Sequence, residues 1–173
     1  MQRQSLAAIR YIEQTVPAAP LSGVVLRYGN FYGPGASDSL VELIRKRRFP
    51  VIGDGEGVWS WIHLDDAASA AVAALERGDP GVYNITDDEP ARVSEWLPYL
   101  AEAVGAKPPM RVPAWLARPM AGSVAVRWMI EGRGSSNDKS KRELNWQPIW
   151  SSWREGFRQG LTEAAREARP ATG

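Results

Sequence analysis

The 173-residue chain contains no cysteine and only one histidine. Without cysteine it cannot form disulfides, thiolate zinc sites, iron–sulfur clusters or a cysteine nucleophile. A single histidine cannot build a histidine-rich metal centre, and no nucleophile constellation surrounds it. The sequence therefore predicts no metal site.

Long apolar runs and a strong charge imbalance are also missing. No apolar run approaches the ~18 residues that a membrane-spanning helix needs, and the opening residues 1–4 (MQRQ) do not lead into the apolar block of a signal peptide. Because 21 Lys and Arg face 20 Asp and Glu, the net charge of +1 gives no overall field that would attract nucleic acid or anionic lipid. We expect a cytoplasmic protein with neither a nucleic-acid nor a membrane partner.

What the sequence does contain is an alternation of helical and strand patterns. Residues 5–16 repeat apolar side chains every three or four positions, which predicts an amphipathic helix with no earlier element to cover its apolar face. Further helices are predicted over 40–48, 65–75, 95–104, 114–130, 137–144 and 151–168, and strands over 22–28, 51–52, 58–62, 82–85 and 110–112. This order favours a single α/β unit over residues 1–168, with a few-stranded parallel or mixed sheet, a mostly helical end, and a frayed tail at 169–173.

Several short motifs carry a family resemblance. Residues 26–35 (LRYGNFYGPG) are similar to the Arg-x-x-Asn-x-Tyr-Gly-Pro-Gly motif of extended short-chain dehydrogenases/reductases, the NAD-dependent epimerase/dehydratase family. Segments 62–68, 81–85, 94–95 and 144–148 with 155–156 follow in the family's order. The chain resembles the C-terminal, substrate-side part of an atypical Rossmann-like member, whose N-terminal dinucleotide-binding half is not in this sequence.

The resemblance implies NAD or NADP as cofactor, with Tyr28 and Gly29 placed beside the nicotinamide by their backbone. A phosphate-binding turn requires closely spaced glycines between a strand and a helix N-terminus. The glycines of 29–35 are too loosely spaced for that turn, and those of 53–57 join two predicted strands. We therefore do not expect this chain alone to bind the cofactor.

The family's proton chemistry uses a Tyr and a Lys four residues later on one helix, because the Lys lowers the pKa of the Tyr. In relatives a Glu lies four residues beyond that Lys. If Glu13 is this Glu, Ile9 and Ser5 stand where Lys and Tyr should be, and the fourth residue after Tyr11 is Thr15. No catalytic residue is assigned.

Four residues are predicted to line a substrate cleft. The resemblance places Asn30 there, although a turn residue bonded to its own backbone is the alternative. Sugar-nucleotide enzymes of the family carry an Arg that grips pyrophosphate in the stretch where this chain has Trp59 and Trp61. Neutral ligands that are ring-bearing or apolar are therefore favoured over nucleotide sugars. His63 is either a ligand contact or a buried residue at a strand end.

Two functions remain open. The first is a partial or degenerate NAD(P)-dependent epimerase, dehydratase or reductase, hence an oxidoreductase or isomerase fragment, that contributes a small-molecule cleft. The second is a non-enzymatic module that binds a small molecule or a protein partner. A missing N-terminal half or self-association into a homo-oligomer would cover the strand edge at 22–28.

Overall fold

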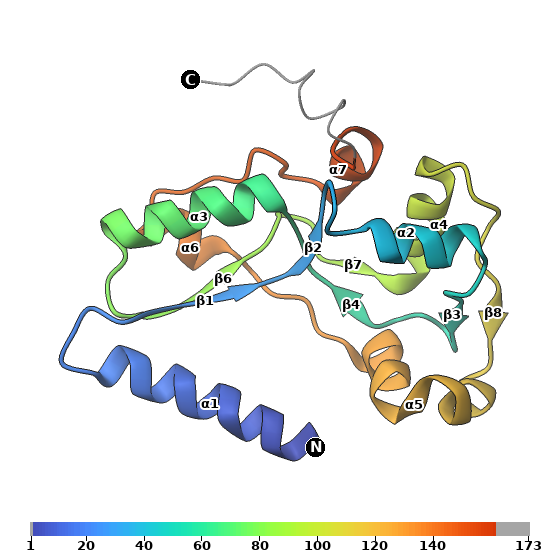
Figure 1. Ribbon diagram of the computed structural model, residues 1–173, viewed down its shortest axis with the longest axis horizontal. Helices are drawn as coiled ribbons and strands as arrows, with labels where there is room; N and C mark the ends of the chain where they lie inside the picture. The colour runs from blue at the N-terminus through green and yellow to red at the C-terminus, as the bar shows by residue number, and fades with distance from the viewer. Residues whose placement is uncertain (1, 162–173) are drawn as a thin grey trace.

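The computed structural model describes residues 2–161, so the predicted tail at 169–173 and the end of the helix predicted over 151–168 lie outside the described residues. It confirms the predicted α/β fold (Figure 1). The helices are α1 (Gln2–Ala18), α2 (Asp38–Arg45), α3 (Leu64–Arg77), α4 (Val93–Ala103), α5 (Ala114–Glu131), α6 (Asp138–Glu143) and α7 (Trp153–Gln159). The strands are β1 (Val24–Tyr28), β2 (Asn30–Tyr32), β3 (Val51–Ile52), β4 (Val58–Trp59), β5 (Trp61–His63), β6 (Gly81–Ile85), β7 (Ala91–Arg92) and β8 (Arg111–Val112).

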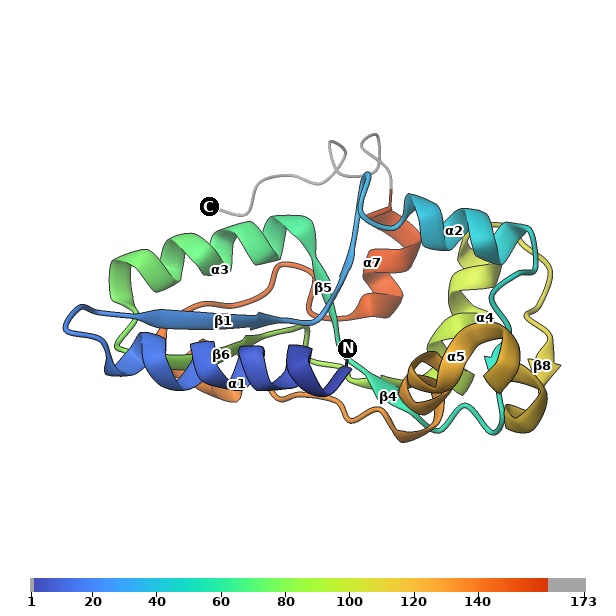
Figure 2. The same ribbon diagram turned by 60° about the horizontal axis from the view of Figure 1, so that its bottom comes forward.

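The longest strand pair is β1 with β6, which run parallel from Val24 opposite Gly81 to Tyr28 opposite Ile85. Helices α1 and α3 lie on opposite faces of this pair (Figure 2). Helix α3 turns Ala67, Ala70, Ala73 and Ala74 inward, and small side chains let a helix lie close to a sheet. This part of the molecule is a parallel α/β layer, as the alternation of patterns predicts.

The other six strands form three short pairs. β2 pairs with β5 and β3 with β8 in parallel, and β4 pairs with β7 in antiparallel orientation. The glycine turn at 53–55 joins β3 and β4, yet these two strands pair with different partners rather than with each other. β2 and β7 were not predicted: β2 lies in a glycine-rich stretch that reads as a turn, and both strands are only two or three residues long.

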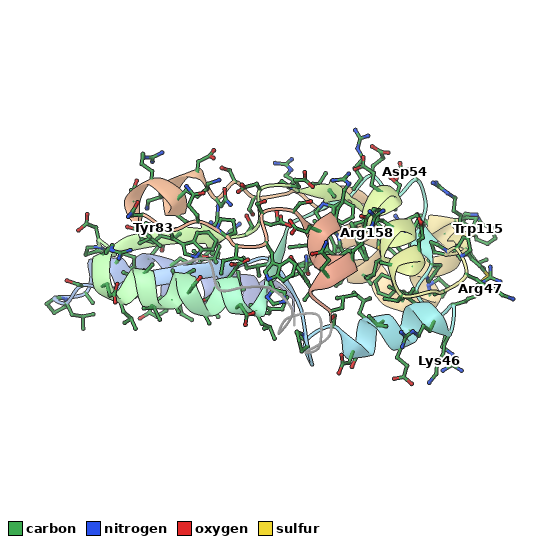
Figure 3. The ribbon with its side chains drawn as sticks, turned by 90° about the horizontal axis from the view of Figure 1, so that it is seen from above. Lys46, Arg47, Asp54, Tyr83, Trp115 and Arg158 are labelled. Atoms are coloured by element: carbon green, nitrogen blue, oxygen red, sulfur yellow. The ribbon has the colours of Figure 1, made fainter. Side chains whose placement is uncertain are left out.

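Two hydrophobic cores hold these layers together. We call the cluster around α3 and β6 the Ala-rich core and the cluster around α4, α5 and α7 the Trp-rich core. The Ala-rich core consists of Ile62, Ala67, Ala70, Ala73, Ala74, Tyr83, Ile85, Leu144 and Trp146. The largest side chains of the Trp-rich core are Tyr32, Trp61, Trp96, Trp150, Trp153 and Phe157. Tyr83 on β6 and Trp115 on α5 lie in opposite halves of the molecule along its long axis (Figure 3).

Helix α1 keeps much of its apolar surface exposed. Ile9, Tyr11 and Ile12 each expose half or more of their surface. The carboxylate of Glu13 accepts hydrogen bonds from the guanidinium of Arg27, which ties α1 to β1. This ion pair lowers the pKa of Glu13.

Two searches of the described residues bear on function class. None of the helices there combines the length and the apolarity needed to cross a bilayer. The same residues contain no group of acidic and histidine side chains that could hold a metal ion.

Candidate functional site

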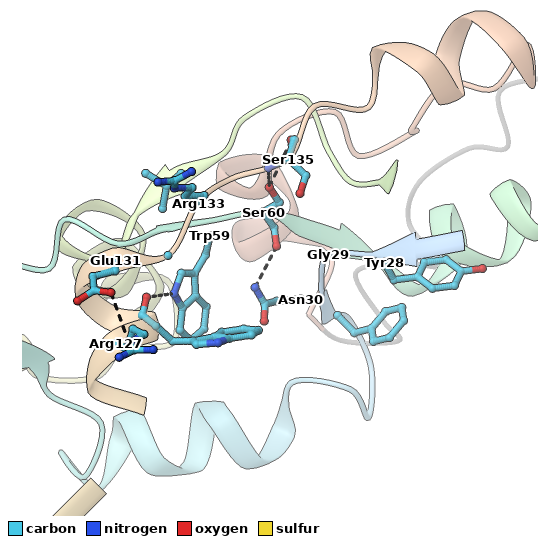
Figure 4. A pocket seen from close by; sticks show the side chains of 13 residues that line it. Tyr28, Gly29, Asn30, Trp59, Ser60, Arg127, Glu131, Arg133 and Ser135 are labelled. Atoms are coloured by element: carbon cyan, nitrogen blue, oxygen red, sulfur yellow. Dashed lines mark hydrogen bonds and ion pairs between the residues drawn. The ribbon is translucent and has the colours of Figure 1, made fainter. Parts of the chain in front are cut away.

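A pocket of about 660 Å³ opens where β1 passes into β2, a volume within the range of small-molecule sites. Its other walls come from β4 with the residue that follows it, and from the end of α5 with the connection that leads to α6 (Figure 4). The pocket is lined by Tyr28, Gly29, Asn30, Phe31, Val58, Trp59, Ser60, Arg127, Trp128, Glu131, Gly132, Arg133 and Ser135.

The pocket brings together four of the six residues selected from the sequence: Tyr28, Gly29, Asn30 and Trp59. Trp61 and His63 are absent from its lining and are 1% and 0% exposed. Neither Trp61 nor His63 is therefore part of this candidate site.

Asn30 is fixed by its neighbours across the strand pair. Its backbone N–H and its Nδ2 both donate to the carbonyl oxygen of Ser60, at 2.8 and 3.1 Å. The alternative that Asn30 bonds its own local backbone is wrong, because its partner lies 30 residues further along the chain. This bond uses one of the two N–H groups on Nδ2, so Asn30 can offer a ligand its Oδ1 as acceptor and the second N–H as donor.

Trp59 and Trp61 lie on one side of their strand segment, as strand alternation predicts, with ring centroids 5.9 Å apart. That side faces the Trp-rich core. Trp61 is buried against Trp96 and Phe157, with ring centroids at 4.8 and 5.1 Å. Trp59 lies at the edge of the core, half-buried, and its Nε1 donates to the carbonyl of Trp128 at 3.1 Å.

His63 is a structural residue at a strand end. Its Nδ1 accepts the backbone N–H of Asp65 at 3.1 Å and so caps α3, and its Nε2 lies 3.0 Å from the carbonyl oxygen of Gly160. An accepting Nδ1 and a carbonyl partner at Nε2 require the neutral ring with its proton on Nε2. A Cβ on Gly33 would stand 2.9 Å from this ring, so the glycine there makes room for His63.

Among the pocket residues that sequence reasoning missed are Arg127, Trp128, Glu131 and Arg133. They come from the end of α5 and the connection after it, about 100 residues beyond Asn30. The interrupted helical pattern at Gly132 and Gly134 marks this segment in the sequence, but it does not indicate which strand the segment contacts.

The titratable groups of the pocket give no acid–base pair. Arg127 Nε lies 3.4 Å from Glu131 Oε2, one helical turn away. Burial raises the pKa of Tyr28, whose hydroxyl lies 3.4 Å from the carbonyl oxygen of Ala67, so this phenol stays protonated at neutral pH. The arrangement can hold and orient a ligand by ring contacts and hydrogen bonds.

Comparisons with known proteins identify the family. The model of the NAD dependent epimerase/dehydratase family matches residues 2–86. Through these residues the chain belongs to that family. This confirms the resemblance carried by residues 26–35 and 62–68.

Similar proteins were found by sequence and by structure. The chain is 40% identical over 157 residues to a 3-diazoavenalumate denitrifying reductase of Streptomyces, covering 88% of this chain and 52% of the relative. A functionally unknown conserved protein from Silicibacter pomeroyi is 30% identical, with a TM-score of 0.66 and coverage of 91% and 53%. A UDP-glucose 4-epimerase from Thermotoga maritima, solved with UDP-glucose, is 28% identical, with a TM-score of 0.64 and coverage of 95% and 52%. The chain spans about half the length of these relatives.

The described residues of this epimerase/dehydratase-family chain do not fit the phosphates of a dinucleotide. Gly33 faces the His63 ring rather than open space, and the first turn of the following helix, α2, carries the carboxylate of Asp38. The turn at 53–57 leads from a strand into a strand, and a Cβ on Gly57 would meet the backbone of Met129 at 2.7 Å. Helix α1 contains no lysine, so the Tyr–Lys dyad of the family has no counterpart on it.

Proposed function

We propose that this chain supplies the substrate-side cleft of an epimerase/dehydratase-family reductase that takes a ring-bearing small molecule. The observation that carries the proposal is an aromatic-walled pocket with one anchored amide inside it. The Streptomyces relative, at 40% identity, is named a reductase, which favours reduction over epimerisation as the reaction class.

The aromatic walls come from two ring pairs. Trp59 and Trp128 meet edge to face with centroids 5.9 Å apart, and Tyr28 and Phe31 are tilted at 5.3 Å. Phe31 and Trp128 leave about half of their surface exposed, so a ligand ring can still bury apolar area against them. Asn30 lies between Trp59 and Tyr28 (Figure 4) and would orient a polar substituent through Oδ1.

A neutral indole cannot offset the charge of a diphosphate, and Trp59 stands where sugar-nucleotide enzymes of the family carry a phosphate-gripping Arg. The nitrogen of its ring is already bonded to the carbonyl of Trp128. We therefore expect ring-bearing compounds to bind better than nucleotide sugars.

The non-enzymatic binding module stays a second candidate because of two observations on the described residues. They contain no turn that suits a dinucleotide's phosphates, and α1 lacks the Tyr–Lys dyad. Calorimetric titration with NADH and NADPH tests this part. We expect no binding by this chain alone, and a dissociation constant in the low micromolar range would show that the cofactor site has been misplaced.

The cleft itself is tested by comparing trans-cinnamamide with UDP-glucose as ligands of the full chain. Quenching of Trp fluorescence and calorimetry should both show the ring compound binding tighter by about 1–3 kcal/mol, the scale of ring burial and stacking. Trp59→Arg should reverse the order, Trp59→Phe should keep it, and Asn30→Ala should weaken the amide. A wild type that prefers UDP-glucose, or an Asn30→Ala variant with unchanged affinity for every ligand, contradicts the cleft assignment.

A further inference from the structure

The charged groups of the pocket do not cancel. Arg127 has Glu131 as its partner at 3.4 Å, and Glu131 is the one carboxylate among the residues that line the pocket. Arg133 makes no ion pair or hydrogen bond with any residue in the described part of the chain. Its guanidinium is thus the uncompensated charge of a pocket whose other walls are aromatic.

The backbone that carries Arg133 is held firmly. The residues on either side are glycines, and a Cβ on Gly132 or Gly134 would stand 2.7 Å from the carbonyl oxygen of Trp128 or 2.6 Å from Pro90. The N–H of Val58 donates to the carbonyl oxygen of Gly132 at 2.8 Å. Close packing on both sides fixes where the Arg133 side chain begins.

A second hydrogen bond holds the same connection two residues further on. The backbone N–H of Ser135 donates to Ser60 Oγ at 2.9 Å, which fastens the segment beside Asn30 (Figure 4). The side-chain hydroxyl of Ser135 makes no hydrogen bond within the described residues and also lines the pocket. Both Arg133 and Ser135 thus line the pocket with donors that have no hydrogen-bond partner in the described part of the chain.

We propose that Arg133 is a specificity-determining residue that binds the carboxylate of an aromatic acid whose ring lies between the aromatic walls of this pocket. The inference rests on the proposed function and names its substrate class. A planar guanidinium matches a carboxylate with two parallel N–H···O bonds, and the Ser135 hydroxyl can donate a third. A held backbone reduces the ordering cost of binding.

The test compares trans-cinnamate with trans-cinnamamide, which share a ring and differ in charge. Their affinities for the full chain are measured by calorimetry and Trp quenching at low and high salt. We expect the acid to bind about 10-fold tighter at low salt, with the ratio falling as salt rises. Arg133→Gln should bring the ratio to about 1, and Arg133→Lys should keep part of it because charge remains without the fork. Arg118→Gln, an exposed arginine outside the pocket, removes the same charge and should leave the ratio unchanged.

Phenyl phosphate separates a carboxylate site from a general anion site. We expect it to bind no tighter than cinnamate, and a clear preference for the phosphate overturns the carboxylate assignment. If the amide binds as well as the acid, or if Arg133→Gln keeps the 10-fold ratio, the Arg133 proposal fails while the proposed cleft stands. If neither ring compound binds, both fail.

Discussion

The Ala-rich core and the Trp-rich core differ in the size of the side chains that fill them and in the length of the strand pairs beside them. Around α3, alanines bring a helix close to the parallel pair β1–β6, and that pair keeps five residues in register. Around α4 and α7, indole rings fill the space between strand pairs of two residues, β3–β8 and β4–β7. The first region is held by backbone pairing and close approach, and the second by large side chains that few other residues could replace. Substitutions should therefore affect the two regions differently.

Removing a ring from the Trp-rich core should have the largest effect. Trp96 is fully buried and contacts Trp59 and Trp61 at ring distances of 5.0 and 4.8 Å. Trp96→Ala should cost about 3–5 kcal/mol in unfolding free energy, because the lost burial leaves a large cavity. Urea denaturation measures this cost. Trp115→Ala, at a site 74% exposed, is the matched control and should stay within about 0.5 kcal/mol.

Hydrogen exchange can measure the stabilities of the Trp-rich core and the Ala-rich core separately. In the Trp96→Ala variant, amides of α4 should lose more protection than amides of β1 and β6. Equal loss in both regions would show that the two cores unfold as one unit.

The next effect concerns pH and Asp87, whose backbone N–H bonds the carbonyl oxygen of Trp61 at 2.7 Å. Burial raises the pKa of Asp87 from 3.8 to about 8, and the backbone N–H groups of Glu89 and Trp153 offset only part of this rise. With the folded pKa above the unfolded one, the contribution of Asp87 to stability is complete below about pH 4 and is lost as pH rises to about 8.

Unfolding free energy measured between pH 5 and pH 8 should fall by on the order of 4 kcal/mol from this group. Asp87→Asn should flatten most of that slope, leaving a remainder from Asp66, whose pKa is also raised by burial. A variant with the wild-type slope would show that Asp87 does not carry the pH dependence.

A smaller effect is expected where the two cores meet. His63 caps α3 with Nδ1 and reaches Gly160 with Nε2, next to the rings of Tyr32 and Trp150. His63→Ala should cost about 1–3 kcal/mol through the lost cap, the lost hydrogen bond and the cavity. His63→Asn should restore the cap of α3 but neither the hydrogen bond to Gly160 nor the ring packing. Thermal unfolding that ranks the variants otherwise would contradict the capping role.

The smallest effect is expected at Tyr28. Its hydroxyl lies 3.4 Å from the carbonyl oxygen of Ala67, a long and weak hydrogen bond on the edge of the Ala-rich core. Tyr28→Phe should change stability by less than about 0.5 kcal/mol and leave the affinity for trans-cinnamamide unchanged. A large loss of affinity in calorimetry would give the phenol a polar role in the pocket.

The parts of the fold that follow local patterns could be predicted from the sequence. The apolar repeat of residues 5–16 gave a helix, and Gly78 ends α3 as predicted. The partners of β3, β4 and β7 could not be predicted, because each pair joins residues 32 to 60 positions apart and spans only two residues. Pairs this short contain no periodicity from which register could be derived.

The pocket residues also fall into a group that the sequence could predict and a group that it could not. Asn30 and Trp59 belong to motifs, so sequence reasoning selected them. Arg133 and Trp128 reach the pocket through the contact of Gly132 with β4, which no local pattern encodes. Trp61 was placed in the cleft because alternation gives the shared side of two residues but not which side is the core.

The passage from β1 to β2 has a consequence for how the molecule responds to a ligand. The N–H of Gly29 bonds Ile85 on β6 and the next N–H, that of Asn30, bonds Ser60 beside β5, so adjacent amides belong to different strand pairs. A Cβ on Gly29 would stand 2.9 Å from the carbonyl oxygen of Ser60, which leaves no room for a larger residue at this crossing. A ligand bound over this crossing would contact both the β1–β6 pair and the β2–β5 pair and would stabilise their contact with each other. Saturating ligand should then raise the midpoint of thermal unfolding and also make the transition steeper. Tighter packing around only one of the two strand pairs would not produce this change in cooperativity.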